Sequence, residues 1–343
     1  MGRCVLNNKK LSIGVIGVGG IANGVHFPSL MNIDNVAITA VCDIIEERAA
    51  EAAAKYSIPS FYSNYREMIK KETLDAVFVL VQPDQIFRIT LDCLNQGLDV
   101  FAEKPSGITS YQAQTLLRKS RETDRILQIG LNRRYIPLVR HVVRLMKETT
   151  KITQVEGTFI KHASADFYDG CANALECDTI HSIDLVRWIA GGNPVKAATV
   201  MGKVNSEVPN LWSSVFLFDN DVTGIIKANY QAGGRVHTFE IHGPGASAFI
   251  NIGFGDAACE ADIIYADGKG THSISAAGSG DLKRVHIDGM ELAGGKDYYR
   301  YYGYYHEDAE FIECVRTRKR PLADIEEAVK TMHLVDLLNN SRI

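Results

Sequence analysis

The sequence predicts an α/β protein: a doubly wound parallel sheet followed by a second α/β domain with a large, open, mostly antiparallel sheet. Three observations favour this fold class. Over the first third of the chain, near-continuous apolar runs alternate with helix-forming segments. After residue 150, apolar and polar residues alternate in runs separated by turn residues. The length of 343 residues favours two domains over one core, and we place them at 1–131 and 132–343.

The elements of the first domain follow from short apolar runs and the helix-forming segments between them. Each apolar run has the length and continuity of a buried strand. The expected strands are 12–18, 36–43, 74–81, 99–103 and 125–131, and the expected helices are 46–56, 84–95 and 111–123. Strand and helix at this spacing predict right-handed crossovers with helices on both faces of the sheet.

The second domain is expected to be built on alternating strands. These are 153–162, 196–204, 212–218 and 223–231, with turn signals at 219–221 and 243–245. One helix, over 178–190, interrupts them and is closed by Gly191-Gly192. The tail from Glu307 to Asn340 is expected to be helical again.

The composition argues against several classes of protein. A net charge of −4 gives no reason to expect nucleic acid or an anionic membrane as a partner. No apolar run approaches the roughly 20 residues of a membrane span, and the first residues indicate a polar leader to a strand rather than a secretion signal. The seven cysteines are scattered and contain no C-x-x-C pair, which favours a cytoplasmic protein over a disulfide framework.

A glycine-rich turn follows the first expected strand. Gly17-Val18-Gly19-Gly20-Ile21-Ala22 has the pattern G-x-G-x-x-A between a strand and a helix. Gly17 allows the tight turn, Gly19 lets the backbone approach a pyrophosphate, and Ala22 lets the helix pack closely on the strand. The helix N-terminus, with Gly20 and Ile21, offers free N–H groups to the phosphates. We therefore expect an NAD(P)-binding Rossmann domain.

An acidic residue ends the second expected strand. Asp43 lies 21 residues beyond Ala22, where a carboxylate accepts hydrogen bonds from both adenosine ribose hydroxyls and repels a 2′-phosphate. NAD is therefore expected rather than NADP, although Arg48 is a nearby cation that tolerates the phosphate.

The strand 99–103 runs straight into Glu103-Lys104-Pro105. A solvated loop would explain two charges in a row. Open parallel sheets, however, bind ligands beyond the carboxyl ends of their strands. We therefore expect Glu103 and Lys104 to project towards the nicotinamide half of the cofactor.

Four segments together resemble the Gfo/Idh/MocA family of oxidoreductases: the glycine turn, FAEKPSG, DTIHSIDLVRW and FEIHGPGASAFI. The resemblance covers nearly the whole chain, and Glu-Lys-Pro is its most specific part. It implies an NAD-dependent enzyme that transfers hydride between a secondary hydroxyl of a sugar, sugar derivative or cyclitol and the nicotinamide. It also implies a substrate pocket between the domains, and homodimers or homotetramers formed through the C-terminal sheet.

The resemblance also implies two catalytic residues. Lys104 corresponds to the family's active-site lysine and His181 to the histidine that faces it. An ammonium stabilises the alkoxide that develops when a hydroxyl is oxidised. An imidazole can take or return the hydroxyl proton near neutral pH.

Two departures from the family pattern leave roles open. Many members have an aspartate four residues before the histidine, whereas here that residue is Cys177 and Asp178 stands three before. Asp178 could orient His181 from the same helical face, or cap the helix. A metal site formed by Cys171, Cys177, Asp178 and His181 is disfavoured, because no second C-x-x-C or H-x-x-H element accompanies it.

The second departure is in the loop after strand 74–81. Gln82-Pro83 leads to Phe87, where the family often has a histidine. Gln82 and Pro83 are still expected to lie against the cofactor, but the role of that histidine is absent.

Polar residues near the domain boundary are candidates for substrate recognition. In inositol dehydrogenases an arginine in the matching segment touches the substrate, which points to Arg133, and Lys161 and His162 end a strand directed to the same pocket. Each could equally be a surface charge. The tyrosine-rich run 298–308 could stack on a sugar ring, but a subunit interface or packing is favoured. Two other functions stay open: an NAD-using glycosidase and a non-enzymatic dinucleotide sensor.

Overall fold

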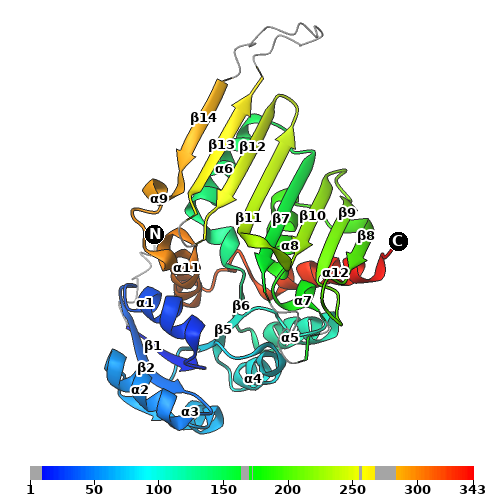
Figure 1. The fold of residues 1–343 in the computed structure, drawn as a ribbon. Helices are drawn as coiled ribbons and strands as arrows, with labels where there is room; N and C mark the ends of the chain where they lie inside the picture. Colours follow the sequence, from blue (N-terminus) through cyan, green and yellow to red (C-terminus); the bar gives the residue numbers. More distant parts are fainter. Residues whose placement is uncertain (1–9, 164–169, 172, 255–256, 267–282) are drawn as a thin grey trace, which may run out of the picture. The chain divides into compact units, whose positions relative to one another are not determined.

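The computed structural model describes residues 10–163, 170–171, 173–254, 257–266 and 283–343 (Figure 1). It divides into two compact units. The first comprises the described residues up to Gly130 together with Tyr304–Val329, and the second comprises Leu131–Gly303 with Lys330–Ile343. The domains predicted from the sequence assign all residues after 131 to the second domain. They differ from the two structural units chiefly at residues 304–329, which belong to the first unit.

The first unit contains a six-stranded sheet in the order β3-β2-β1-β4-β5-β6, with every pair parallel. This confirms the predicted doubly wound sheet. The strands are β1 (Leu11–Ile16), β2 (Val36–Cys42), β3 (Ser60–Tyr62), β4 (Ala76–Val79), β5 (Asp99–Glu103) and β6 (Leu127–Gly130). The short strand β3 was not predicted.

Two helices of this unit begin at side-chain caps. The Asn64 side chain accepts from the Arg66 N–H, and the Thr109 hydroxyl accepts from the Gln112 N–H. The helical segments are η1 (Ala22–His26), α1 (Phe27–Leu30), α2 (Glu46–Tyr56), α3 (Tyr65–Lys71), α4 (Pro83–Asn95), α5 (Ser110–Thr123) and α11 (Tyr304–Thr317). Of these, α3 had not been predicted.

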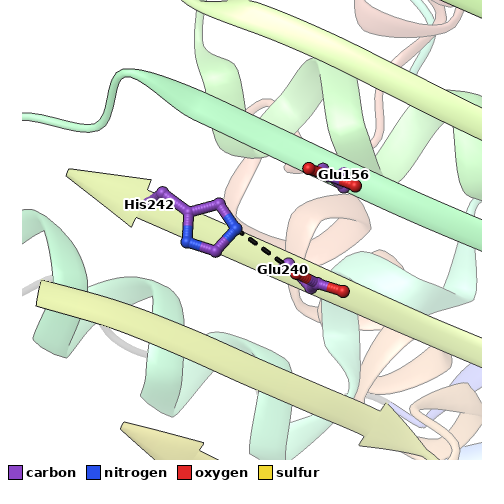
Figure 2. A group of neighbouring side chains, drawn as sticks. All are labelled: Glu156, Glu240 and His242. Atoms are coloured by element: carbon purple, nitrogen blue, oxygen red, sulfur yellow. Dashed lines mark ion pairs between the residues drawn. The ribbon is translucent and has the colours of Figure 1, made fainter. Parts of the chain in front are cut away.

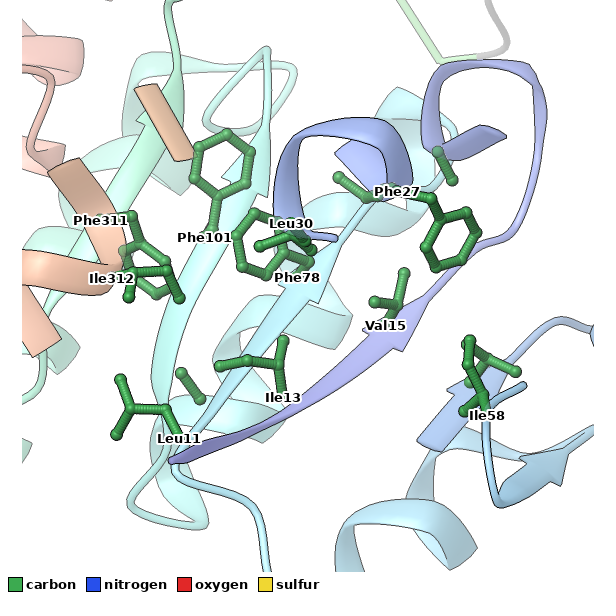
Figure 3. Packing of buried hydrophobic residues seen from close by; sticks show 14 of the residues in the cluster. Leu11, Ile13, Val15, Phe27, Leu30, Ile58, Phe78, Phe101, Phe311 and Ile312 are labelled. Atoms are coloured by element: carbon green, nitrogen blue, oxygen red, sulfur yellow. The ribbon is translucent and has the colours of Figure 1, made fainter. Parts of the chain in front are cut away.

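The apolar core of the first unit includes residues from the end of the chain (Figure 3). The Phe311 ring from α11 packs edge-on against Phe78 of β4 and Phe101 of β5, with ring centroids 5.3 and 5.8 Å apart. Both strand residues are fully buried. The segment from residue 304 is therefore part of the same core as the parallel sheet.

The second unit contains an eight-stranded sheet in the order β14-β13-β12-β11-β7-β10-β9-β8. Among the described strands of this second sheet, only the pair β7–β10 is parallel. This confirms the prediction of a mostly antiparallel sheet. The strands are β7 (Gln154–His162), β8 (Pro194–Gly202), β9 (Leu211–Phe218), β10 (Thr223–Asn229), β11 (Gln231–Gly243), β12 (Ala246–Ile252), β13 (Cys259–Tyr265) and β14 (Lys283–Asp288).

Helices pack on one face of this sheet. A Cβ at Gly157 of β7 would lie 2.6 Å from the Ser182 Oγ of α8, so this glycine lets α8 lie directly on the strand. The helical segments of the unit are η2 (Asn132–Tyr135), α6 (Pro137–Thr149), α7 (Ala174–Cys177), α8 (Ile180–Ala190), α9 (Gly289–Leu292) and α10 (Tyr298–Tyr301), and α12 (Ile325–Asn340) ends in it. Within the part of the chain that the structure describes, no helix has both the length and the apolar character needed to cross a bilayer.

Candidate active site

The glycine turn after β1 has the shape that a dinucleotide requires. Gly17 has a φ of +92°, and a Cβ there would lie 2.4 Å from the Leu80 carbonyl oxygen, so only glycine fits. At Gly19 and Gly20 a Cβ would meet no atom within 4 Å. The backbone therefore faces open space where a pyrophosphate would approach it.

Asp43 is held by the turn that it follows. Its Oδ2 accepts from the Val18 N–H and its Oδ1 from the Ile45 N–H, both at 3.0 Å. Each carboxylate oxygen keeps a second lone pair for a ribose hydroxyl. The carboxylate is thus fixed before any ligand arrives.

Two cavities meet at this turn. One of about 400 Å³ is lined by residues that include Gly17, Gly19, Asp43, Arg48 and Gln82. The other, of about 430 Å³, is lined by Gly19, Gly20 and Arg48, with Asn23 and Lys55 beside them. Both cavities border Gly19 and Arg48, and only the first also borders Asp43. This arrangement fits an adenosine ribose beside Asp43 and a pyrophosphate against the glycine backbone.

Two further residues predicted to bind the cofactor lie at helix starts. Ile21 is 36% exposed and directly precedes η1, and Pro83 is the buried first residue of α4.

Glu103 is the last residue of β5 and Lys104 follows it. The carboxyl end of β5 lies at the same sheet edge as those of β1 and β4. The Glu103 side chain is buried, with its Oε2 accepting from the Lys104 N–H at 3.1 Å. Lys104 itself is half-buried. Glu103 and Lys104 were both expected to project towards the nicotinamide, but the Glu103 side chain is buried and that of Lys104 is half-buried.

A buried histidine reaches Glu103 from η1. The Nε2 of His26 lies 3.2 Å from Oε1 of Glu103, and its Nδ1 lies 3.0 Å from Oδ1 of Asp308 on α11. Burial alone lowers the pKa of His26, but Asp308 and Glu103 outweigh it and raise the pKa to about 10. Sequence reasoning missed this contact, because the partners lie 77 and 282 residues away and no local spacing marks them.

In the second unit, Asp178 lies between α7 and α8 and is held by two partners. The Tyr230 hydroxyl donates to Asp178 Oδ2 at 2.9 Å, and the Lys161 ammonium forms an ion pair with the same oxygen. Burial and Asp178 raise the pKa of Tyr230 well above its usual value. These contacts place Asp178 in a polar cluster with Lys161 and Tyr230.

His181 is the second residue of α8 and is half-buried. Asp178 stands three residues before it, about one helical turn away. His162, by contrast, is exposed and next to Lys161 on β7, so its side chain leaves the opposite face of the sheet. The structure brings Lys161 and Asp178 together and does not bring His162 to them.

Arg133 is buried in η2, where it contacts residues of β7 and β11. Its Nη2 lies 3.0 Å from Nδ1 of His237, and its guanidinium lies 5.0 Å from the Phe159 ring centroid. Burial and the cations Arg133, Arg235 and Lys161 lower the pKa of His237, so the imidazole is neutral and its Nδ1 accepts. The neighbouring Arg134 has a separate partner, since its Nε and Nη2 donate to Asp184 of α8 at 2.8 and 2.6 Å.

Comparison with known proteins decides the family. A model described as "Oxidoreductase family, NAD-binding Rossmann fold" matches residues 11–131, and one for the GFO/IDH/MocA C-terminal domain matches residues 151–249. The chain belongs to the GFO/IDH/MocA family. This confirms the resemblance drawn from the sequence and the prediction of an NAD-binding oxidoreductase.

Two relatives of this GFO/IDH/MocA protein are named inositol dehydrogenases. It is 27% identical to the myo-inositol 2-dehydrogenase of Thermotoga maritima over 188 residues, 53% of this chain and 55% of that protein. It is 25% identical to the inositol 2-dehydrogenase of Salmonella typhimurium over 237 residues, 66% and 70% of the two chains. The match thus spans little more than half of the Thermotoga enzyme. A solved dehydrogenase structure from Chromobacterium violaceum has a TM-score of 0.86 at 19% identity, covering 97% of this chain and 96% of that one, and shares the fold.

A separate cluster of possible metal ligands lies on the uncovered face of the second sheet (Figure 2). Among the described residues, Glu156, Glu240 and His242 bring ligand atoms within 4.8 Å of one another; the set Cys171, Cys177, Asp178 and His181 forms no such group. Glu156 and Glu240 are directly opposite in the β7–β11 register. Lys227 lies 3.6 Å from Glu156 and His242 lies 3.4 Å from Glu240, so ion pairs within the sheet account for the cluster.

Proposed function

We propose that this GFO/IDH/MocA protein is an NAD-dependent dehydrogenase acting on a secondary hydroxyl of a sugar, sugar derivative or cyclitol. One observation carries the proposal: Lys104 follows β5 at the same sheet edge as the open glycine turn after β1. A cation is thus placed at the edge where a doubly wound sheet binds its ligand. The names of the two inositol dehydrogenase relatives support a cyclitol as the first substrate to test.

The cofactor site is proposed to take its residues from the first unit. Gly17, Gly19 and Gly20 would receive the pyrophosphate, Asp43 the adenosine ribose, and Gln82 would line the same cavity. When bound, the nicotinamide accepts or returns the hydride. NAD is proposed over NADP because the Asp43 carboxylate, held by two backbone N–H groups, would repel a 2′-phosphate.

We assign the charge stabilisation and the proton transfer at the substrate hydroxyl to residues of the chain. Lys104 would stabilise the negative charge on the substrate oxygen, and His181 would take or return its proton. Asp178, which pairs with Lys161 and Tyr230, is kept as a candidate acceptor for substrate hydroxyls. Arg133 is kept as a candidate substrate residue.

The proposal is tested with a panel of inositols, aldoses and keto-sugars, assayed separately with NAD and NADP by absorbance at the nicotinamide band. We expect oxidation of at least one polyol with NAD. Lys104→Ala should lower kcat by about a hundredfold or more, while the Kd for NAD stays close to that of the wild type. Lys70→Ala, an exposed lysine on α3, is the matched control. Turnover that survives Lys104→Ala would refute the assignment of Lys104.

We also propose that copies of the chain associate through the uncovered face of the second sheet, giving a dimer or a tetramer. The strand register places four apolar side chains that are 40–51% exposed on this face: Val200, Val215, Val236 and Phe249. Exposed apolar side chains gathered on one face are typical of a subunit interface. Val215→Glu should lower the mass measured by light scattering to that of a monomer. Met31→Glu, also at an exposed apolar side chain, should not; a wild-type monomer would contradict the proposal.

A further inference from the structure

We propose that His26 and Asp308 are positioning residues of the reaction: they hold the Glu103 carboxylate, which in turn fixes the backbone at Lys104. The inference rests on the proposed function, because it concerns the reaction in which Lys104 is the candidate catalytic residue. Neither His26 nor Asp308 belongs to the sequence motifs that identify the site.

The contacts form a continuous line through the first unit. Asp308 Oδ1 and Oδ2 lie 3.0 and 3.1 Å from Nδ1 of His26. Nε2 of the same ring lies 3.2 Å from Oε1 of Glu103, and Oε2 of Glu103 accepts from the Lys104 N–H at 3.1 Å. Both oxygens of Glu103 are therefore used, one towards His26 and one towards Lys104.

The line is enclosed. His26 and Asp308 have no exposed surface, and Glu103 is 7% exposed. The edges of Phe78, Phe101 and Tyr304 surround the imidazole at centroid distances of 5.2–5.9 Å. With no solvent to replace a lost partner, each hydrogen bond in the line decides the orientation of the next group.

The protonation of His26 follows from the same geometry. Each ring nitrogen faces a carboxylate, and a neutral imidazole has one N–H, so only the imidazolium donates to both. The pKa of His26, raised to about 10, agrees with this. The titratable groups that face the ring are Asp308 and Tyr304 from α11 and Glu103 from β5.

The carboxylate of Glu103 packs closely against Gly130 of the neighbouring strand. Gly130, at the end of β6, pairs with Glu103, and a Cβ there would lie 3.1 Å from the carboxyl carbon. A glycine at this position lets the carboxylate lie against the neighbouring strand. Loss of the His26 contact would leave this buried carboxylate with one partner fewer and free it to turn away from the Lys104 N–H.

The test compares two amide replacements of His26. In His26→Gln the amide nitrogen can lie near the position of Nε2 and donate to Glu103, whereas in His26→Asn it lies near Nδ1 and reaches Asp308 alone. Both remove the charge and both bury an amide. We expect kcat of His26→Asn to be about tenfold to a hundredfold below that of His26→Gln, the effect of one hydrogen bond to a charged group. The Kd for NAD should differ little between them, and exposed His333→Gln is the control.

The outcomes separate this inference from the proposed function. Lys104→Ala is assayed beside them; if it keeps wild-type turnover, the proposed function fails and this inference with it. If Lys104→Ala loses turnover while His26→Asn and His26→Gln share one kcat, only the inference is overturned. Should either His26 variant fail to fold, Asp308→Asn replaces it. That change leaves the imidazolium with one carboxylate, so the alkaline limb of the kcat–pH profile should move to lower pH; an unmoved limb overturns the inference.

Discussion

At the scale of single residues, Glu103 and Lys104 are neighbours in one motif but have different surroundings. Glu103 is the last residue of β5 and its side chain is directed into the protein, where His26 and the Lys104 N–H hold it. Lys104 is half-buried at the carboxyl edge of the parallel sheet, the edge where doubly wound sheets generally bind ligands. Two adjacent charged residues of one motif can therefore differ in burial: Glu103 is buried and accepts from the Lys104 N–H, while the Lys104 side chain is half-buried.

The raised pKa of His26 gives a prediction on stability against pH. Folding raises this pKa from 6.5 to about 10, so the folded state favours the imidazolium. The stabilisation is fully present below pH 6.5 and is lost as the pH rises through about 10. In urea unfolding, the free-energy difference between the wild type and His26→Gln should shrink steadily from pH 6.5 to 10. A difference that stays constant over this range would show that His26 is not charged in the folded protein.

The residues that could be predicted from the sequence are those with a local pattern. Gly17, Gly19 and Asp43 were found because a strand, a turn and an acid follow one another at fixed spacing. His26 and Asp308 have no such spacing, since their contact joins residues 282 apart. The exposed position of His162 was also beyond prediction, because one residue of strand register decides the face on which a side chain lies.

At the scale of elements, α8 is held to η2 by a buried ion pair. Arg134 donates twice to Asp184, and the Thr331 hydroxyl also donates to that carboxylate at 2.6 Å. Neither charged residue has more than 1% of its side chain exposed. The pair therefore fixes the helix that carries His181.

Removing one member of this pair should cost much more than removing an exposed pair. Arg134→Ala leaves the Asp184 carboxylate buried without its cation, so the free energy of unfolding should fall by about 3–5 kcal/mol. Arg144→Ala breaks an exposed i,i+4 pair with Glu148 and should cost about 0.5 kcal/mol or less. Chemical denaturation of both variants makes the comparison; equal losses would contradict the role given to the buried pair.

Most elements could be predicted because their residues have strong local preferences. The helix 46–56 and the strand 99–103 match the structure, because one is rich in alanine and glutamate and the other is a short apolar run. By contrast, several elements were not predicted: α6 and β11–β14 of the second unit and, in the first unit, the strand β3 and the helix α3. The strand has three residues and the helix buries only Met68, so neither has enough periodicity to be recognised.

At the scale of the whole molecule, the chain returns to its first unit after completing the sheet of the second. Tyr304–Val329 belongs with the parallel sheet, and Phe311 lies in its core. Helical periodicity could predict that the tail is helical but not which sheet it packs on, because an apolar helix face fits either core. This is why the boundary at 131 does not describe the packing of the segment 304–329.

The stability of the first unit should therefore depend on a residue near the end of the chain. Phe311→Ala removes a fully buried ring that packs edge-on against Phe78 and Phe101, and the free energy of unfolding should fall by about 3–5 kcal/mol. Tyr111→Ala, at a ring that is 71% exposed on α5, is the control. The measurement is denaturant unfolding followed by intrinsic fluorescence. A loss no larger than that of the control would show that the late segment is dispensable for this core.

The late segment also sets a rule for building hybrid enzymes from related sequences. A donor's second unit cannot replace everything after residue 131 as a single block, because residues 304–329 have to match the core of the host's NAD-binding unit. Junctions are needed near 131, near 303 and near 329, and the host must supply the stretch between the last two. Asp308 lies in that stretch, so an exchange that replaces it would alter the contacts of His26 and Glu103 without changing the Glu103-Lys104 motif.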